Sequence, residues 1–205
     1  MSINRFSFHR QSDQSGFSLI EVMISIVIVT IGLLASLAAL GVTMAANQTS
    51  QEDMFARQLA SEAMESIFNA RNSSQLAFSA INNTTALPTP GIFLPNAQSP
   101  MCAGPDGILD TADDVPCLTA AGAECPHAGV ECLTEPGPDG IVGTADDVVV
   151  SLYNFTRTIT ISPLDDSSGN VIQTLVEVTI TVNYTVPNHA GTKSYVLNEY
   201  ISEYH

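Results

Sequence analysis

Hydrophobic and polar residues divide the chain into a polar start, a long apolar run and an alternating C-terminal part. Residues 22–46 form a run of 25 residues without a charge, and Glu21 stands directly before it. A helix of that length reaches roughly 37 Å at about 1.5 Å per residue. This is enough to cross a hydrocarbon core of about 30 Å. The pattern therefore predicts that residues 17–46 form a membrane-spanning helix.

Residues 47–72 continue the helical pattern, but their apolar positions lie on one face only. Phe55, Leu59, Ala63 and Ile67 recur every four residues, which places them on one side of a helix. No proline separates this segment from the apolar run, so we expect one continuous helix of roughly 50–55 residues. Its outer half needs another element to cover the apolar stripe.

The residues after the helix predict a loop region followed by a sheet. The predicted loop region covers residues 73–148. Residues 73–101 are rich in Ser, Asn, Thr and Pro, which is typical of loops, and their scattered apolar residues predict packing on the head. In residues 149–205 apolar and polar positions alternate, and two turns, at residues 165–169 and 187–191, divide them into three antiparallel strands. Arg157 is the exception on the apolar face of the first strand. The apolar positions are Tyr153, Phe155, Ile159 and Ile161, then Val176, Val178, Ile180, Val182, Tyr184 and Val186, then Tyr195, Leu197 and Ile201. The predicted fold is α+β, a long N-terminal helix packed on a C-terminal antiparallel sheet.

One short motif at the start of the apolar run carries chemistry. An ionisable group such as Glu21 costs roughly 2.5–3.5 kcal/mol at the centre of a membrane helix, so it indicates a functional site. Cleavage after Gly16 would make Phe17 the N-terminus, and its free amine could neutralise the Glu21 carboxylate within the chain or on a neighbouring helix. The sequence Gly16-Phe-Ser-Leu-Ile-Glu-Val22 resembles the processing site of type IV prepilins and type II secretion pseudopilins.

The resemblance implies a type IV pilin-like fold and a defined assembly route. Residues 1–16 would be a leader that prepilin peptidase removes, Phe17 would be N-methylated, and Glu21 would dock the subunit against other pilin or pseudopilin subunits. Arg5 and Arg10 favour a cytoplasmic N-terminus, so the head would lie outside the inner membrane before assembly. The final location would be an extracellular pilus or a periplasmic pseudopilus.

Two other interpretations account for part of the N-terminal pattern. A secretory signal peptide has a shorter apolar core than this run and does not carry a glutamate. A plain membrane anchor explains the length of the run but not the motif before it.

Within the family, residues 31–34 (Ile-Gly-Leu-Leu) and 57–65 are similar to PilV-type minor pilins. We therefore expect a minor pilin, with a type II secretion pseudopilin or a non-polymerising, membrane-anchored calcium-binding surface domain as alternatives.

The charge balance restricts the partners of the head. The chain has a formal charge of −15, and without residues 1–16 it has 4 basic and 20 acidic residues, a charge of −16. This charge argues against nucleic acid and anionic membrane surfaces as partners of the head. It favours a cation or a basic protein surface.

Two acidic repeats lie in the loop region. Residues 104–115 match residues 137–148 at ten of twelve positions, with a spacing of 33 residues. Each contains the turn signature Pro-Asp-Gly followed by Ala-Asp-Asp. The repeats are similar to repeats of bacterial surface proteins that are suspected calcium loops, and Ca²⁺ prefers such hard oxygen ligands. The alternative is a pair of plain acidic turns. The candidate calcium ligands of up to two sites are Asp106, Asp110, Asp113, Asp114, Asp139, Asp146 and Asp147.

Four cysteines lie in the same stretch. An even number of cysteines in an oxidising compartment predicts two disulfides, with three connectivities open. Sequence proximity favours Cys102–Cys117 and Cys125–Cys132. The alternative is a zinc site made by these thiols and His127, although no Cys-x-x-Cys pair is present.

No catalytic constellation is recognisable in the sequence. The histidines are scattered, no serine or cysteine has a paired base at a known spacing, and no glycine-rich phosphate loop is present. We expect a non-enzymatic protein. The histidines are His9, His127, His189 and His205.

Overall fold

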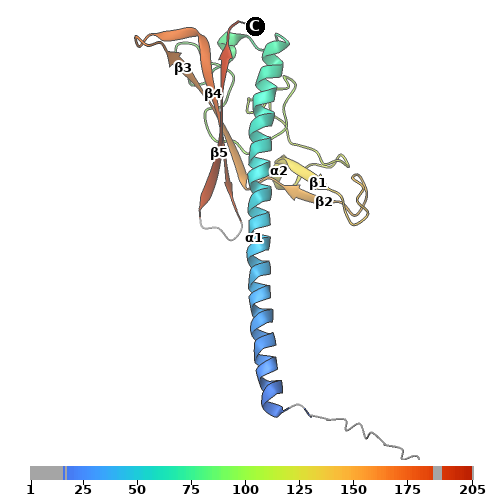
Figure 1. Ribbon diagram of the computed structural model, residues 1–205. Helices are drawn as coiled ribbons and strands as arrows, with labels where there is room; N and C mark the ends of the chain where they lie inside the picture. Colours follow the sequence, from blue (N-terminus) through green and yellow to red (C-terminus); the bar gives the residue numbers. More distant parts are fainter. Residues whose placement is uncertain (1–15, 17, 187–190, 205) are drawn as a thin grey trace, which may run out of the picture. The chain divides into compact units, whose positions relative to one another are not determined.

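One long helix, α1 (Leu19–Asn72), runs through the first third of the chain in this computed structural model (Figure 1). The structure describes residues 16, 18–186 and 191–204. The carbonyl of Ser18 accepts the first helical bond, from the Glu21 N–H at 2.9 Å. The helix ends where Ser74 takes a left-handed conformation with φ of 61°. Its 54 residues confirm the prediction of one continuous helix.

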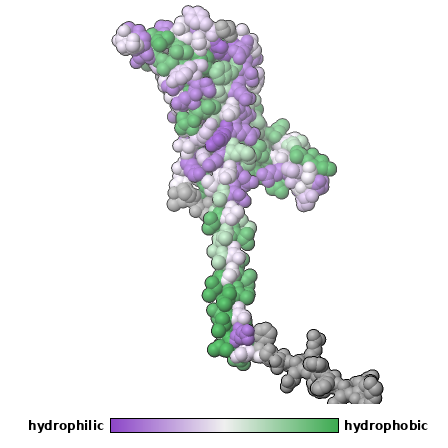
Figure 2. Space-filling view, in the orientation of Figure 1, coloured by the Kyte–Doolittle hydropathy of each residue, from purple (hydrophilic) through white to green (hydrophobic). Residues whose placement is uncertain are grey.

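The chain divides into two compact units within α1, residues 1–44 and residues 45–205. In α1, residues 22–46 carry no charge, and every one of them is exposed. Large apolar side chains there are widely exposed, as the green surface in Figure 2 shows. By length and composition this helix can cross a membrane.

The second unit contains a three-stranded antiparallel sheet in the order β3-β4-β5. The strands are β3 (Phe155–Asp165), β4 (Val171–Thr185) and β5 (Thr192–Ser202), as Figure 1 shows. The alternating positions Val178, Ile180, Val182 and Tyr184 of β4 are all buried. The predicted meander is therefore confirmed. Of the predicted turn at 187–191, only Gly191 lies within the described residues.

The second half of α1 covers the apolar face of the sheet. Leu59, Ala63 and Ile67 are at most 1% exposed and share one core with the buried residues of β3, β4 and β5. The four-residue repeat in the sequence therefore correctly predicted which face of α1 packs against the sheet. Phe55 and Phe68 pack at the margin of this core.

The segment after α1 also contributes to the core, as its scattered apolar residues predict. It contains the short 3-10 helix η1 (Phe78–Ala80), and its Ile81 and Phe93 are buried. The Asn83 side chain donates to the Ile159 carbonyl at 2.8 Å and accepts from the Ile161 N–H at 3.0 Å. These bonds satisfy free backbone groups on the outer edge of β3, which protects that edge from pairing with another chain.

A small hairpin lies apart from the three-stranded sheet, and the sequence pattern did not predict it. Its strands are β1 (Cys132–Glu135) and β2 (Val148–Ser151), paired antiparallel. β1 therefore lies inside the region predicted as loop. Each strand has only four residues, too few for an alternating pattern to stand out.

Tyr153 was wrongly predicted to belong to the first strand of the large sheet. It lies in the turn before β3, is 60% exposed, and stacks on His127 with ring centroids 4.1 Å apart. His127 lies in the short α2 (Pro126–Gly129), where it has a positive φ of 60°.

Candidate functional site

The N-terminal motif lies at the very start of α1. Gly16 and Glu21 are exposed, and Glu21 is the acidic residue of the first helical turn. The Ser25 hydroxyl donates to the Glu21 carbonyl at 2.7 Å, so that bond leaves the Glu21 carboxylate unengaged. Across residues 16, 18–186 and 191–204, no side chain forms an ion pair with this carboxylate. Phe17, the predicted new N-terminus, lies outside the described residues.

The first acidic loop is closed by its own carboxylates. The Ile108 N–H donates to Asp106 Oδ1 at 2.8 Å, as expected of the predicted Pro-Asp-Gly turn. The Thr111 hydroxyl donates to Asp113 Oδ1 at 2.6 Å and lies 3.3 Å from Asp114 Oδ1 and 3.4 Å from Asp106 Oδ2. The loop therefore brings three of its four predicted calcium ligands around one hydroxyl.

The second acidic loop repeats this geometry. The Ile141 N–H donates to Asp139 Oδ1 at 2.9 Å, and the Thr144 hydroxyl donates to Asp146 Oδ1 at 2.7 Å. The Thr144 hydroxyl also lies 3.4 Å from Asp147 Oδ1. The two loops thus share one local structure as well as one sequence pattern.

The carboxylates of these loops differ in their electrostatics. The hydrogen bond from the Thr111 hydroxyl holds the pKa of Asp113 below its usual value, and Thr144 does the same to the pKa of Asp146. Burial raises the pKa of Asp114. Among the described residues, no group of three Asp, Glu, His or Cys side chains is already arranged to hold a metal ion. The carboxylates accept hydrogen bonds from N–H and O–H groups of their own loop.

Asp110 does not lie with the other predicted ligands of the first loop. Its carboxylate accepts from Arg157 Nε at 2.7 Å and from the Arg157 guanidinium again at 3.3 Å. Both side chains are fully buried, with exposures of 1% and 0%. Arg157 also donates to the Leu59 carbonyl of α1 at 3.2 Å. This buried ion pair connects the first loop, the sheet and the helix.

The sequence contains two signals for this pair. Arg157 is the exception on an apolar strand face, and a charged residue there needs a buried partner. Asp110 is the position at which the second repeat has Gly143. A charge present in only one of two repeats is a signal for a contact that only that repeat makes.

Comparison with known proteins identifies the N-terminal motif. Residues 11–37 match the family model described as the prokaryotic N-terminal methylation motif. The chain carries the methylation motif of type IV pilin-like proteins. No curated protein and no solved structure matches the chain significantly. The matched family model describes a processing motif and names no catalytic activity.

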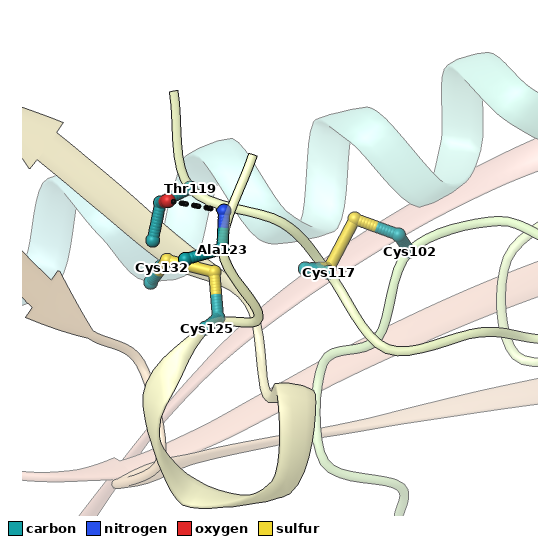
Figure 3. Close-up of a disulfide and its surroundings, with 6 residues drawn as sticks. All are labelled: Cys102, Cys117, Thr119, Ala123, Cys125 and Cys132. Carbon is teal, nitrogen blue, oxygen red and sulfur yellow. Dashed lines mark hydrogen bonds between the residues drawn. A yellow bond between two sulfur atoms is a disulfide. The ribbon is translucent and has the colours of Figure 1, made fainter. Parts of the chain in front are cut away.

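The head contains two disulfides in the same stretch of sequence as the acidic loops, and Figure 3 shows both. Cys102 pairs with Cys117 across a Cα–Cα distance of 5.0 Å and encloses the first loop. Cys125 pairs with Cys132 at 5.8 Å and holds the start of β1. This is the pairing that sequence proximity favours. All four cysteines are bonded, so none is a free thiol for the zinc alternative.

Glu131, which the sequence did not single out, is a half-buried residue directly before β1. Burial raises its pKa to about 7, and the nearby Glu62 carboxylate adds to this effect while Arg157 opposes it. Between the unfolded pKa of 4.5 and the folded pKa of about 7, the folded protein keeps a proton on Glu131 that the unfolded chain releases. The stability that comes from this proton is complete below the unfolded pKa and is lost as the pH rises through about 7.

We expect Glu131→Gln to flatten the pH dependence of stability. Relative to the variant, the wild-type protein loses up to about 3 kcal/mol of unfolding free energy between pH 5 and pH 8. Urea unfolding at both pH values measures this difference. Glu135→Gln, at an exposed position of β1, serves as the control and leaves the pH profile unchanged. An equal pH profile for Glu131→Gln and the wild type would contradict the assignment.

Proposed function

We propose that the protein is a structural subunit of a type IV pilus, a minor pilin, assembled from the inner membrane after removal of residues 1–16. One observation carries this proposal: the methylation motif at residues 11–37 leads into a 54-residue helix whose apolar half is entirely exposed. Exposed apolar surface of this size needs a membrane or neighbouring apolar helices to cover it. A pilin subunit uses the membrane before assembly and neighbouring helices afterwards.

Processing of the N-terminus tests the proposal. We expect the mature chain to begin at Phe17, with a methylated amine, because Gly16 precedes an uncharged span that only Glu21 interrupts. Intact-mass measurement or N-terminal sequencing of the membrane-extracted protein checks this. A mature form that keeps Arg5 and Arg10 would rule out a pilin and favour the non-polymerising anchored domain.

A type II secretion pseudopilin is the second candidate, because it shares the motif and the helix. The resemblance of residues 31–34 and 57–65 to PilV-type minor pilins favours the pilus. Mass spectrometry of filaments sheared from the cell surface separates the two: a minor pilin is found in them, whereas a pseudopilin stays in the periplasm.

We further propose that the two acidic loops bind Ca²⁺ and stiffen the head. In the first loop, the Ile108 carbonyl lies 3.3 Å from the Thr111 hydroxyl, beside the oxygens of Asp106, Asp113 and Asp114. Hard carboxylate and carbonyl oxygens on a tight loop are the donors that Ca²⁺ prefers. Asp110 is the least suited of the predicted ligands, since Arg157 occupies both of its oxygens.

Thermal unfolding of the detergent-solubilised protein tests calcium binding. We expect saturating Ca²⁺ to raise the Tm of the metal-free protein by about 5–10 °C, because a cation that binds only the folded state stabilises it. The matched control combines four substitutions and loses this response. They are Asp113→Asn, Asp114→Asn, Asp146→Asn and Asp147→Asn. An unchanged wild-type Tm would identify the loops as plain acidic turns.

A further inference from the structure

The two edge strands of the three-stranded sheet, β3 and β5, are protected very differently (Figure 1). An edge strand presents N–H and C=O groups that can pair with another strand, and native proteins usually block such edges. On β3, Arg157 exchanges two backbone bonds with Gln98, at 2.7 and 2.8 Å, and the Asn83 side chain bonds to two further backbone groups. Pro163, further along β3, has no N–H to offer. The β3 edge is therefore blocked against the addition of a strand.

The hydrogen bonds between β4 and β5 show which backbone groups of β5 point outward. The Glu203 N–H donates to the Thr174 carbonyl at 2.8 Å, in the same register that pairs Ile201 with Val176. Hydrogen-bonded pairs alternate along an antiparallel ladder, so the odd-numbered residues of β5 bond to β4. The backbone groups of the even-numbered residues point away from the sheet. These residues include Ser194, Val196, Asn198 and Tyr200.

Only the end of this outward edge is blocked within the described part of the chain. Arg71 of α1 donates to the carbonyl of Ser202, the last even-numbered residue of β5. Among the described residues, no hydrogen bond reaches the outward N–H and C=O groups of residues 194–200. β5 contains no proline, and its ladder with β4 contains no bulge, although both are common means of blocking an edge. A regular edge thus stays open over residues 194–200.

An open strand edge defines the chemistry of its ligand. Its N–H and C=O groups have the spacing of a β ladder, so the ligand is an extended strand. In an antiparallel ladder, the side chains of the added strand would lie close to Tyr195, Leu197 and Glu199, which occupy the closely spaced positions between hydrogen-bonded pairs.

These three side chains specify the composition of the added strand. Tyr195 and Leu197 are half-buried and pack at the margin of the core. Glu199 is exposed and forms no ion pair with any described residue. A complementary strand is therefore apolar opposite Tyr195 and Leu197 and carries Lys or Arg opposite Glu199.

A second copy of this chain does not supply such a strand. β5 runs along α1 in the same direction, because Lys193 binds Asp53 near one end and Arg71 binds Ser202 at the other. Copies that are anchored through α1 in one membrane therefore hold their β5 strands parallel, not antiparallel. Their β3 edges are blocked, β4 lies inside the sheet, and β1 and β2, with four residues each, are too short to cover residues 194–200.

We propose that residues 194–200 of β5 form an interaction edge, to which a different subunit adds an antiparallel strand. This strand is apolar opposite Tyr195 and Leu197 and basic opposite Glu199. The identity of the partner as a subunit of the same assembly rests on the proposed function. The open edge itself rests on the hydrogen bonds of the sheet.

Photo-cross-linking of the full chain in intact cells tests this proposal. A photoreactive phenylalanine replaces Tyr200 in one variant and Tyr153 in the control, two tyrosines that are 59% and 60% exposed. We expect a cross-link to another protein at position 200, with a yield at least about fivefold above that at position 153. A cross-link to a second copy of this chain, or equal yields at the two positions, would overturn the proposal.

A proline substitution separates strand addition from binding by side chains alone. Val196→Pro removes an outward N–H and breaks no bond to β4, so the Tm of the detergent-solubilised protein should stay unchanged. Combined with the photoreactive residue at position 200, it should lower the cross-link yield at least about fivefold. Val196→Thr keeps the N–H and should leave the yield unchanged. An unchanged yield with Val196→Pro would overturn the proposal, and Asn198→Pro, at the next outward N–H, replaces this variant if it lowers the Tm.

Amide hydrogen exchange of the wild-type protein gives a measurement that needs no substitution. In the detergent-solubilised protein, the even-numbered amides of residues 194–200 should exchange rapidly and the odd-numbered ones slowly. In sheared filaments, the even-numbered amides should exchange at least about tenfold more slowly than in detergent. Unchanged exchange in filaments would overturn the interaction edge and leave the pilin assignment intact. Absence of the protein from filaments would instead count against the proposed function, and the cross-link at position 200 would still decide the interaction edge.

Discussion

Asp110→Asn is expected to lower the unfolding free energy by about 3–5 kcal/mol, the typical cost of breaking a buried ion pair by removing one partner. The variant leaves the Arg157 guanidinium charged and buried without a carboxylate. Asparagine is the appropriate replacement because Asp110 has a φ of 61°, and asparagine tolerates this left-handed conformation better than most residues. Urea unfolding of the detergent-solubilised protein measures the shift of the midpoint.

Two comparison variants separate the ion pair from local effects on the loop. Gly143→Asn changes the equivalent position of the second loop, where an added Cβ meets nothing within 4 Å. Despite the φ of 93° there, we expect it to cost no more than about 1 kcal/mol. Adding Arg157→Met to Asp110→Asn removes the unpaired charge and should restore part of the lost stability. A loss below about 1 kcal/mol for Asp110→Asn would show that the pair contributes little.

The helix and the large sheet could be predicted because their signals are local and periodic. Leu59, Ala63 and Ile67 repeat with the period of a helix, and Val178, Ile180 and Val182 with the period of a strand. Each set is buried in the structure. The same periodicity predicted which face of each element meets the other, since each element has only one apolar face.

The contacts between distant segments could not be predicted in the same way. The β1–β2 hairpin pairs Cys132 with Ser151 and has strands too short for a periodic signal. The Arg157–Asp110 pair joins residues 47 positions apart, and no local pattern specifies which acid among many an arginine will meet. Tyr153 fits the alternation of the next strand by parity alone, but a turn and its stacking on His127 place it elsewhere.

The acidic loops could be predicted in part. Their turns could be predicted, because Pro-Asp-Gly specifies a turn and the same signature occurs twice. The difference in burial between the two loops could not be predicted, because Ile108 and Ile141 are both isoleucine at the same position of the same motif. Only the tertiary structure distinguishes the buried residue from the exposed one.

Glu21→Ala is expected to leave membrane insertion and leader cleavage intact but to reduce incorporation into filaments at least about tenfold, the effect of about 1.4 kcal/mol. Removing the carboxylate lowers the cost of placing this helix in the membrane. It also removes the group that would pair with the N-terminal amine of a neighbouring subunit. Among the described residues, no side chain forms an ion pair with the Glu21 carboxylate. Any stabilisation that comes from its charge would therefore come from contacts made during assembly. Immunodetection of the subunit in sheared filaments and in membranes measures both quantities.

Ser25→Ala is the matched control, because Ser25 lies one turn further along the same helix. Within the described part of the chain, its hydroxyl bonds to the Glu21 carbonyl and to no side chain. We expect this variant to be incorporated at the wild-type level. Glu21→Gln separates charge from size: it retains hydrogen bonding but cannot neutralise an amine, so it should behave like Glu21→Ala if the charge pair drives docking. Normal incorporation of Glu21→Gln together with failure of Glu21→Ala would assign the effect to hydrogen bonding or packing. Normal incorporation of both variants would show that docking does not use the Glu21 carboxylate.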